Sequence, residues 1–156
     1  MASLSTWSLY GLTHRREVRC LASAFIGEIA AILRVIETHD IVSTLELAAA
    51  DANGAHALPS LQLPPFTIYT SDAAGLDKLP LPAPRQIAYF YTQMASFQND
   101  LTAFLAEAHH GNGSGRTGEM RRMLSELEEA LALGNDILRR LRPLVSRGQP
   151  MSLMRA

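Results

Sequence analysis

The sequence predicts a single all-α domain: a bundle of three long helices plus one short helix, with an irregular proline-containing crossover. Two observations support this prediction. Apolar residues recur at steps of three and four over three long stretches, which is the period of one helix face. In addition, 47% of the 156 residues are hydrophobic and 19% are charged, as in a globular chain with a core. We expect a flexible segment at 1–13, a helical domain at 14–145 and a frayed tail at 146–156.

The first long helix is expected over about His14–Thr38. Glu28 interrupts its apolar stretch and has two candidate environments: semi-buried and paired with an arginine of another helix, or at the edge of the stripe in water, which is the commoner arrangement. Cys20, the only cysteine, excludes an intramolecular disulfide and is expected as a small buried hydrophobic residue. The apolar face consists of Val18, Leu21, Phe25, Ile29, Ile32 and Ile36.

A short helix and an extended crossover should follow. Asp40 is placed to cap a helix from Ile41 to about Ala50, and the stretch Asn53–Pro65 reads as a loop. Phe66–Thr70 has β-branched and aromatic residues but no partner strand, so it should lie as extended backbone over the helices. Ser71 can then cap a single turn that Gly75 ends, before three prolines hold the chain extended: Pro80, Pro82 and Pro84.

Two further long helices are expected, one over about 84–109 and one from Thr117 to Leu141 or slightly beyond Pro143. The loop between them is short and rich in glycine, so the two helices should be antiparallel neighbours. Gly134 inside the last helix indicates close approach of helices. Each helix carries an apolar seam: Ile87, Phe90, Met94, Phe97, Leu101 and Phe104 in one, and Met120, Met123, Leu127, Ala130, Gly134, Ile137 and Leu141 in the other.

Tyr89 and Tyr91 flank the seam residue Phe90 and should leave the helix in two directions. In one interpretation they hold the 66–82 segment, with their hydroxyls bonding its free backbone groups. In the other they are half-exposed tyrosines with hydrated hydroxyls. With Tyr69 of the crossover, they form a candidate interaction surface.

A metal site has weak support in the sequence. A carboxylate di-iron bundle needs two Glu-x-x-His pairs and two further glutamates, whereas only Glu107 and His110 form such a pair. Glu28 is the inward glutamate that would join them. The pair lies at a helix end, where histidine is favoured by the helix dipole, so we expect no metal and no other cofactor.

The charge pattern limits the partners. A net charge of −1 gives no general attraction to nucleic acid, so no specific nucleic acid is expected. Basic residues nevertheless gather at a helix C-terminus, where positive charge is favourable, and form a second candidate interaction surface. These residues are Arg139, Arg140 and Arg142.

Three segments, "HRREVRCLASAFIGEIAAI", "FTIYTSDAAGLDKLPLP" and "QIAYFYTQM", together resemble a loose group of uncharacterised bacterial helical proteins. In that group a basic Arg-Arg-Glu segment leads into a long helix, and a Leu-Pro step precedes a helix bearing Phe-Tyr. The resemblance covers about residues 14–105 and implies a helical fold, often behind an N-terminal membrane anchor. Met1–Thr13 is too short and too polar for such an anchor. The resemblance implies no activity and no site residue.

These patterns predict a non-enzymatic helical interaction or scaffold module in the cytoplasm, bound to a protein partner or to a second copy. Two alternatives stay open. One is a metal- or small-molecule-binding helical-bundle enzyme. The other is a peripheral protein at the inner membrane face, making weak contact with anionic lipid through Arg15, Arg16 and Arg19.

Overall fold

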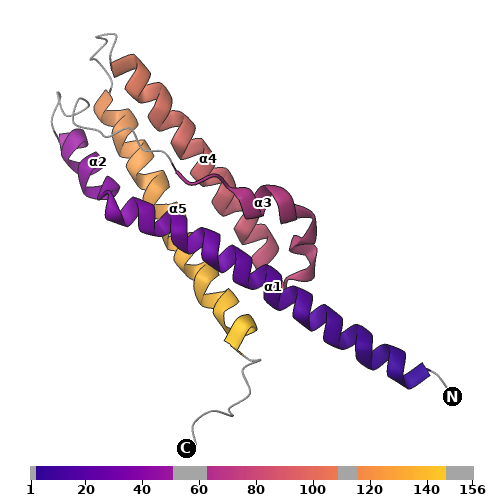
Figure 1. The fold of residues 1–156 in the computed structure, drawn as a ribbon. Helices are drawn as coiled ribbons and strands as arrows, with labels where there is room; N and C mark the ends of the chain where they lie inside the picture. The colour runs from indigo at the N-terminus through magenta and orange to yellow at the C-terminus, as the bar shows by residue number, and fades with distance from the viewer. Residues whose placement is uncertain (1–2, 51–62, 109–115, 147–156) are drawn as a thin grey trace, which may run out of the picture.

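The computed structural model describes residues 3–50, 63–108 and 116–146, with the side chains of residues 11–50, 63–107 and 117–146. Within these ranges every regular element is a helix, so the predicted all-α class is confirmed (Figure 1). The predicted loop at 109–115, most of the connector at 53–65 and the tail beyond Ser146 lie outside them. In chain order the elements are α1 (Ser3–Thr38), α2 (Ile41–Ala50), α3 (Thr67–Asp72), the 3-10 helix η2 (Ala73–Lys78), α4 (Ala83–Ala108) and α5 (Arg116–Ser146).

α4 and α5 pack side by side in opposite directions, as predicted (Figure 1). Two polar contacts at the rim show the register: Gln86 donates to Asp136 at 3.2 Å, and Arg122 donates to Asp100 at 3.1 Å. Every residue of the two predicted seams is buried. Each large apolar side chain removed from water in this way contributes about 1.5–3 kcal/mol, so burial of the seams stabilises the contact between the two helices.

α1 packs its apolar face on α5 and then extends beyond the bundle (Figure 1). Its 36 residues span about 54 Å and the 31 residues of α5 about 46 Å, so the two helices cannot match along their whole length. α1 begins at Ser3 instead of the predicted His14, and most of the segment predicted as flexible is therefore helical. Residues 3–13 contain one glycine and no proline, so little in their composition opposes a helix.

A sharp turn separates α1 from α2. Asp40 takes a left-handed conformation with φ of 47°, which aspartate tolerates better than most residues. The Ser43 hydroxyl donates to the Asp40 carboxylate at 2.8 Å, and the Thr44 amide donates to the Asp40 carbonyl at 3.0 Å. α2 thus begins where predicted, and it packs Ile41 and Leu45 against the core.

The crossover differs from its prediction. Phe66–Thr70 was expected as extended backbone, but residues 67–72 form α3. The single turn expected after Ser71 is instead the longer η2, and Gly75 lies inside η2 instead of ending a turn. Extended backbone returns at Leu79, with φ of −79° and ψ of 147°, and α4 starts at Ala83. The β-branched composition of Phe66–Thr70 was therefore a poor guide. The reason lies in a contact with α1, described below.

Gly134 marks a close approach of α5 to side chains of α4 and α1, as its position predicted. A Cβ built on it would lie 2.9 Å from Cε2 of Phe90 on α4 and 3.1 Å from Cδ2 of Leu33 on α1. Phe90 is fully buried and cannot move aside. Only a residue without a side chain lets these three helices meet.

We expect Gly134→Ala to lower the free energy of unfolding by about 1–2 kcal/mol, because the overpacking cost exceeds the gain in helix propensity. Gly27→Ala is the matched control: Gly27 is also inside a helix, but nothing lies within 4 Å of its added Cβ. The control should gain about 1 kcal/mol. Urea denaturation measures both, and a stabilised Gly134→Ala would contradict the close approach.

Candidate functional site

A carboxylate on α1 holds the start of the crossover. Glu28 accepts hydrogen bonds from the backbone amides of Ile68 at 2.7 Å and Tyr69 at 3.1 Å. Amides in the first turn of a helix have no acceptor within the helix, so an outside acceptor satisfies them. This contact explains why residues 67–72 are helical: the partner that completes the helix start comes from another part of the chain.

The partners of Glu28 correct the sequence-based expectation. Glu28 is partly buried, so it is not a hydrated carboxylate at the edge of the stripe. Its described partners are two backbone amides and a tyrosine hydroxyl, not an arginine. Three hydrogen bonds to one charged group offset the cost of removing it from water.

The third partner is Tyr91 of α4, whose hydroxyl donates to Glu28 at 2.5 Å. Its ring is buried, with Tyr69 stacked on it at a centroid distance of 4.4 Å and Phe66 edge-on at 5.2 Å. Burial first, and then the hydrogen bond to the Glu28 carboxylate, raise the pKa of Tyr91 above its usual value of 10.0. Tyr91 therefore acts as a neutral donor at any physiological pH.

Further contacts hold the rest of the crossover along the same side of α1. Gly75 lies close to α1, because a Cβ built on it would be 3.6 Å from the Leu21 side chain. Lys78 forms a salt bridge with Glu17 of α1 at 3.0 Å. Contacts thus pass from Glu28 toward the N-terminus of α1 as the crossover proceeds from residue 68 to residue 78. We call residues 66–78, held in this way, the strap.

The structure separates the tyrosines that the sequence grouped. Tyr69 of the strap stacks on Tyr91 of α4, whereas Tyr89 is 51% exposed on another side of α4. Tyr91 does hold the 66–82 segment, as one interpretation predicted. It does so through the Glu28 carboxylate, not by bonding the backbone directly.

The weak metal set is not brought together. Glu28 lies beside Tyr91, and Glu107 lies sixteen positions further along α4, about 24 Å away along the helix axis. His110 lies outside the described residues. Among the residues that the structure does describe, no group of three His, Cys, Asp or Glu is arranged to hold a metal ion.

The arginines near the end of α5 share one carboxylate. Arg139 and Arg140 both donate to Asp136, the latter at 2.7 Å, and Gln86 of α4 adds a third hydrogen bond. The bond from Arg140, followed by that from Arg139, lowers the pKa of Asp136 to about 2. Arg142 is exposed on the same helical turn.

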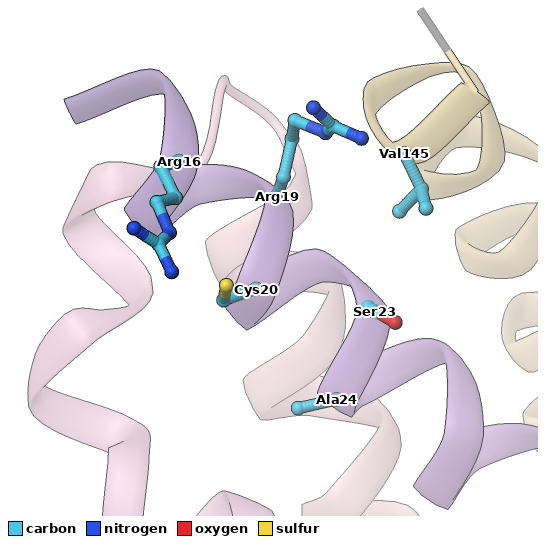
Figure 2. A pocket seen from close by; sticks show the side chains of 6 residues that line it. All are labelled: Arg16, Arg19, Cys20, Ser23, Ala24 and Val145. Atoms are coloured by element: carbon cyan, nitrogen blue, oxygen red, sulfur yellow. The ribbon is translucent and has the colours of Figure 1, made fainter. Parts of the chain in front are cut away.

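A groove of about 620 Å³ lies between α1 and the end of α5, and sequence reasoning missed it. Arg16 and Arg19 leave α1 in different directions, with Arg19 on the side of Val145 (Figure 2). Cys20, which follows Arg19, is exposed, so the expectation of a buried cysteine was wrong. The sequence did contain a signal of this exposure, because Cys20 does not fall on the spacing of the apolar face of this helix. The remaining lining residues are Ser23, Ala24 and Val145.

Comparison with known proteins gives no relative. No family model matches the chain. No curated protein and no solved structure matches it either. In the described part of the chain, no helix combines the length and the apolar character that crossing a membrane requires.

We expect Glu28→Ala to lower the free energy of unfolding by about 2–4 kcal/mol, because it leaves two amides and a hydroxyl without their partner. Tyr91→Phe should cost about 1–2 kcal/mol, and the two losses should not add in the double variant. Denaturation of the four proteins measures this coupling. Glu37→Ala, which removes an exposed carboxylate from the same helix, should stay within about 0.5 kcal/mol of wild type. Additive losses would show that Glu28 and Tyr91 act separately.

The lowered pKa of Asp136 predicts an acid dependence. Its pKa falls from 3.8 to about 2 on folding, so the ionised carboxylate favours the folded state above about pH 4, and this contribution is lost as the pH falls through about 2. Asp136→Asn should therefore lose less stability than wild type between about pH 4 and pH 2. A carboxyl NMR titration that places the Asp136 pKa at its usual value would contradict the arrangement.

Proposed function

We propose that the protein is a non-enzymatic helical interaction module whose partner binds at the end where α1 leaves the bundle. One observation carries the proposal: every residue from Gly11 to Glu17 is exposed although it belongs to a long regular helix. We call residues 11–20 the arm. Isolated helices are marginally stable in water, so a helix that extends beyond its own core gains stability when a partner covers it.

The interior of the bundle supports an interaction role more than catalysis. The buried side chains of the described residues are apolar, and the inward carboxylate, Glu28, is engaged by three hydrogen bonds. Tyr69 and Tyr91 are engaged in the same contact. The exposed surfaces of the described residues that can bind a partner include the arm, the groove beside it and the arginines at the end of α5.

Charge indicates the kind of partner. Arg15, Arg16 and Arg19 are exposed on the arm, whereas Glu17, the acid among them, is paired with Lys78. An excess of positive charge at one surface favours a partner with negative charge, by attraction and by faster association. We propose an acidic protein surface as the main partner. An anionic membrane is the second candidate, because the same three arginines could meet lipid phosphates.

Cys20 offers a direct test, because it is the only cysteine, is exposed and lines the groove. We expect a cleavable cysteine-directed cross-linker applied in cells to attach a discrete protein at Cys20. The matched control is Cys20→Ser combined with Ser125→Cys. Ser125 is exposed on α5, about 30 Å along the helix from Val145.

The control position should not recover the same protein. Recovery of no discrete protein at Cys20, or of the same set at both positions, would contradict binding at this end of the molecule.

A further inference from the structure

Charge is divided along the length of the molecule. Residues 11–20, 72–86 and 136–146 contain eight Arg or Lys and four Asp or Glu, a formal charge of +4. Residues 34–50, 98–108 and 116–129 contain four Arg and nine Asp or Glu, a formal charge of −5. Figure 1 shows the first set at the end where α1 leaves the bundle and the second at the end that carries α2. The molecule therefore has a basic end and an acidic end.

The groove at the basic end is long enough to take a short helix. Leu12, Arg16, Arg19 and Ser23 follow one another at steps of four, three and four, so their Cα atoms lie along one side of α1, from which the two arginine side chains diverge (Figure 2). Leu12 is 61% exposed, and the groove between α1 and α5 lies beside the two arginines. From Leu12 to Ala24 this side of the helix measures about 18 Å. Its small residues, Cys20, Ser23 and Ala24, leave room for close approach.

The acidic end presents a helix that complements this groove. The ten residues of α2 span about 15 Å, and Ile41, Leu45 and Ala48 anchor the helix on the core. On the outer side Leu47 is 72% exposed beside the exposed carboxylate of Glu46. A single exposed leucine is ordinary on a protein surface. Here, however, the two ends carry complementary groups. Leu47 and Glu46 are exposed at the acidic end, whereas Leu12 and two arginines are exposed at the basic end.

We propose that the groove between α1 and α5 binds the outer face of α2 from a second copy of this chain. This inference rests on the proposed interaction function and names the partner. Glu46 would pair with Arg16 or Arg19, and Leu47 would contact the small residues of the groove. The groove is open to solvent along α1, so a helix can lie in it. Its charge also complements a surface that the chain itself carries.

The arrangement predicts head-to-tail association. The groove and α2 are different surfaces at opposite ends, so each copy uses its groove for one neighbour and its α2 for another. Such a heterologous contact leaves one groove and one α2 unoccupied in a pair of copies, so further copies can be added. Growth stops only where the rotation between copies closes a ring. Attraction between opposite charges is screened by salt.

Pairs of variants test this geometry. The double variant Arg16→Glu/Arg19→Glu disables the groove, and the double variant Glu46→Arg/Leu47→Ser disables α2. All four positions are exposed, so both variants should keep the circular dichroism spectrum and the Tm of the wild type. Sedimentation should show wild-type assemblies that grow with concentration and dissociate at least about tenfold more readily at about 500 mM than at about 20 mM NaCl. Each variant alone should be a monomer.

The mixture is decisive. One intact groove and one intact α2 remain in an equimolar mixture of the two variants, so it should form a species of twice the 17.0 kDa chain mass and nothing larger. A wild type that stays monomeric up to about 1 mM in low salt would overturn the proposal. A mixture that stays monomeric while the wild type associates would overturn it too, because association would then use other surfaces.

The outcomes also separate this inference from the proposed function. If the wild type stays monomeric but Cys20 cross-links to a different protein, self-association is overturned and the interaction function stands. If the monomeric wild type floats with vesicles containing about one third anionic lipid, and the groove variant does not, the basic end serves a membrane and the proposed second copy is wrong.

Discussion

The position of the strap depends on one carboxylate. Glu28 of α1 meets two amides of α3 and the hydroxyl of Tyr91 on α4, so a single side chain joins three elements that are far apart in the sequence. Without it, the amides that begin α3 would lie beside apolar rings with no acceptor, which is costly for a backbone group. The aromatic rings around Tyr91 exclude water from this contact and strengthen it.

The strap determines which surfaces of α1 are left for partners. α5 covers the apolar face of the helix, and the strap covers the adjacent side through Leu21 and Glu17. Neither α5 nor the strap covers the side that carries Arg16, Cys20 and Ser23, so this side remains open as a groove. The groove is thus a consequence of how α5 and the strap cover the other sides of α1. The proposed binding role rests on this packing as well as on charge.

Helix length explains why the ends of the molecule differ. α1 is longer than α5, so its N-terminal turns extend beyond the bundle and carry their arginines away from the core. The turn at Asp40 leads into α2 at the opposite end, where acidic residues gather. A chain with a net charge of only −1 thereby acquires two ends of opposite charge. Net charge alone would have hidden this division.

The sequence by itself determined the helical class, the apolar seams of α4 and α5 and the role of Gly134. Each depends on a local period or on the size of one residue, which neighbours along the chain already specify. Only the tertiary structure decided that residues 67–72 are helical, that Cys20 is exposed and that Glu28 binds amides. The start of α3 depends on an acceptor forty positions earlier in the chain, and no local pattern encodes such a partner. Long-range contacts of this kind override weak local preferences, because one satisfied buried group outweighs the few tenths of a kcal/mol by which residue propensities differ.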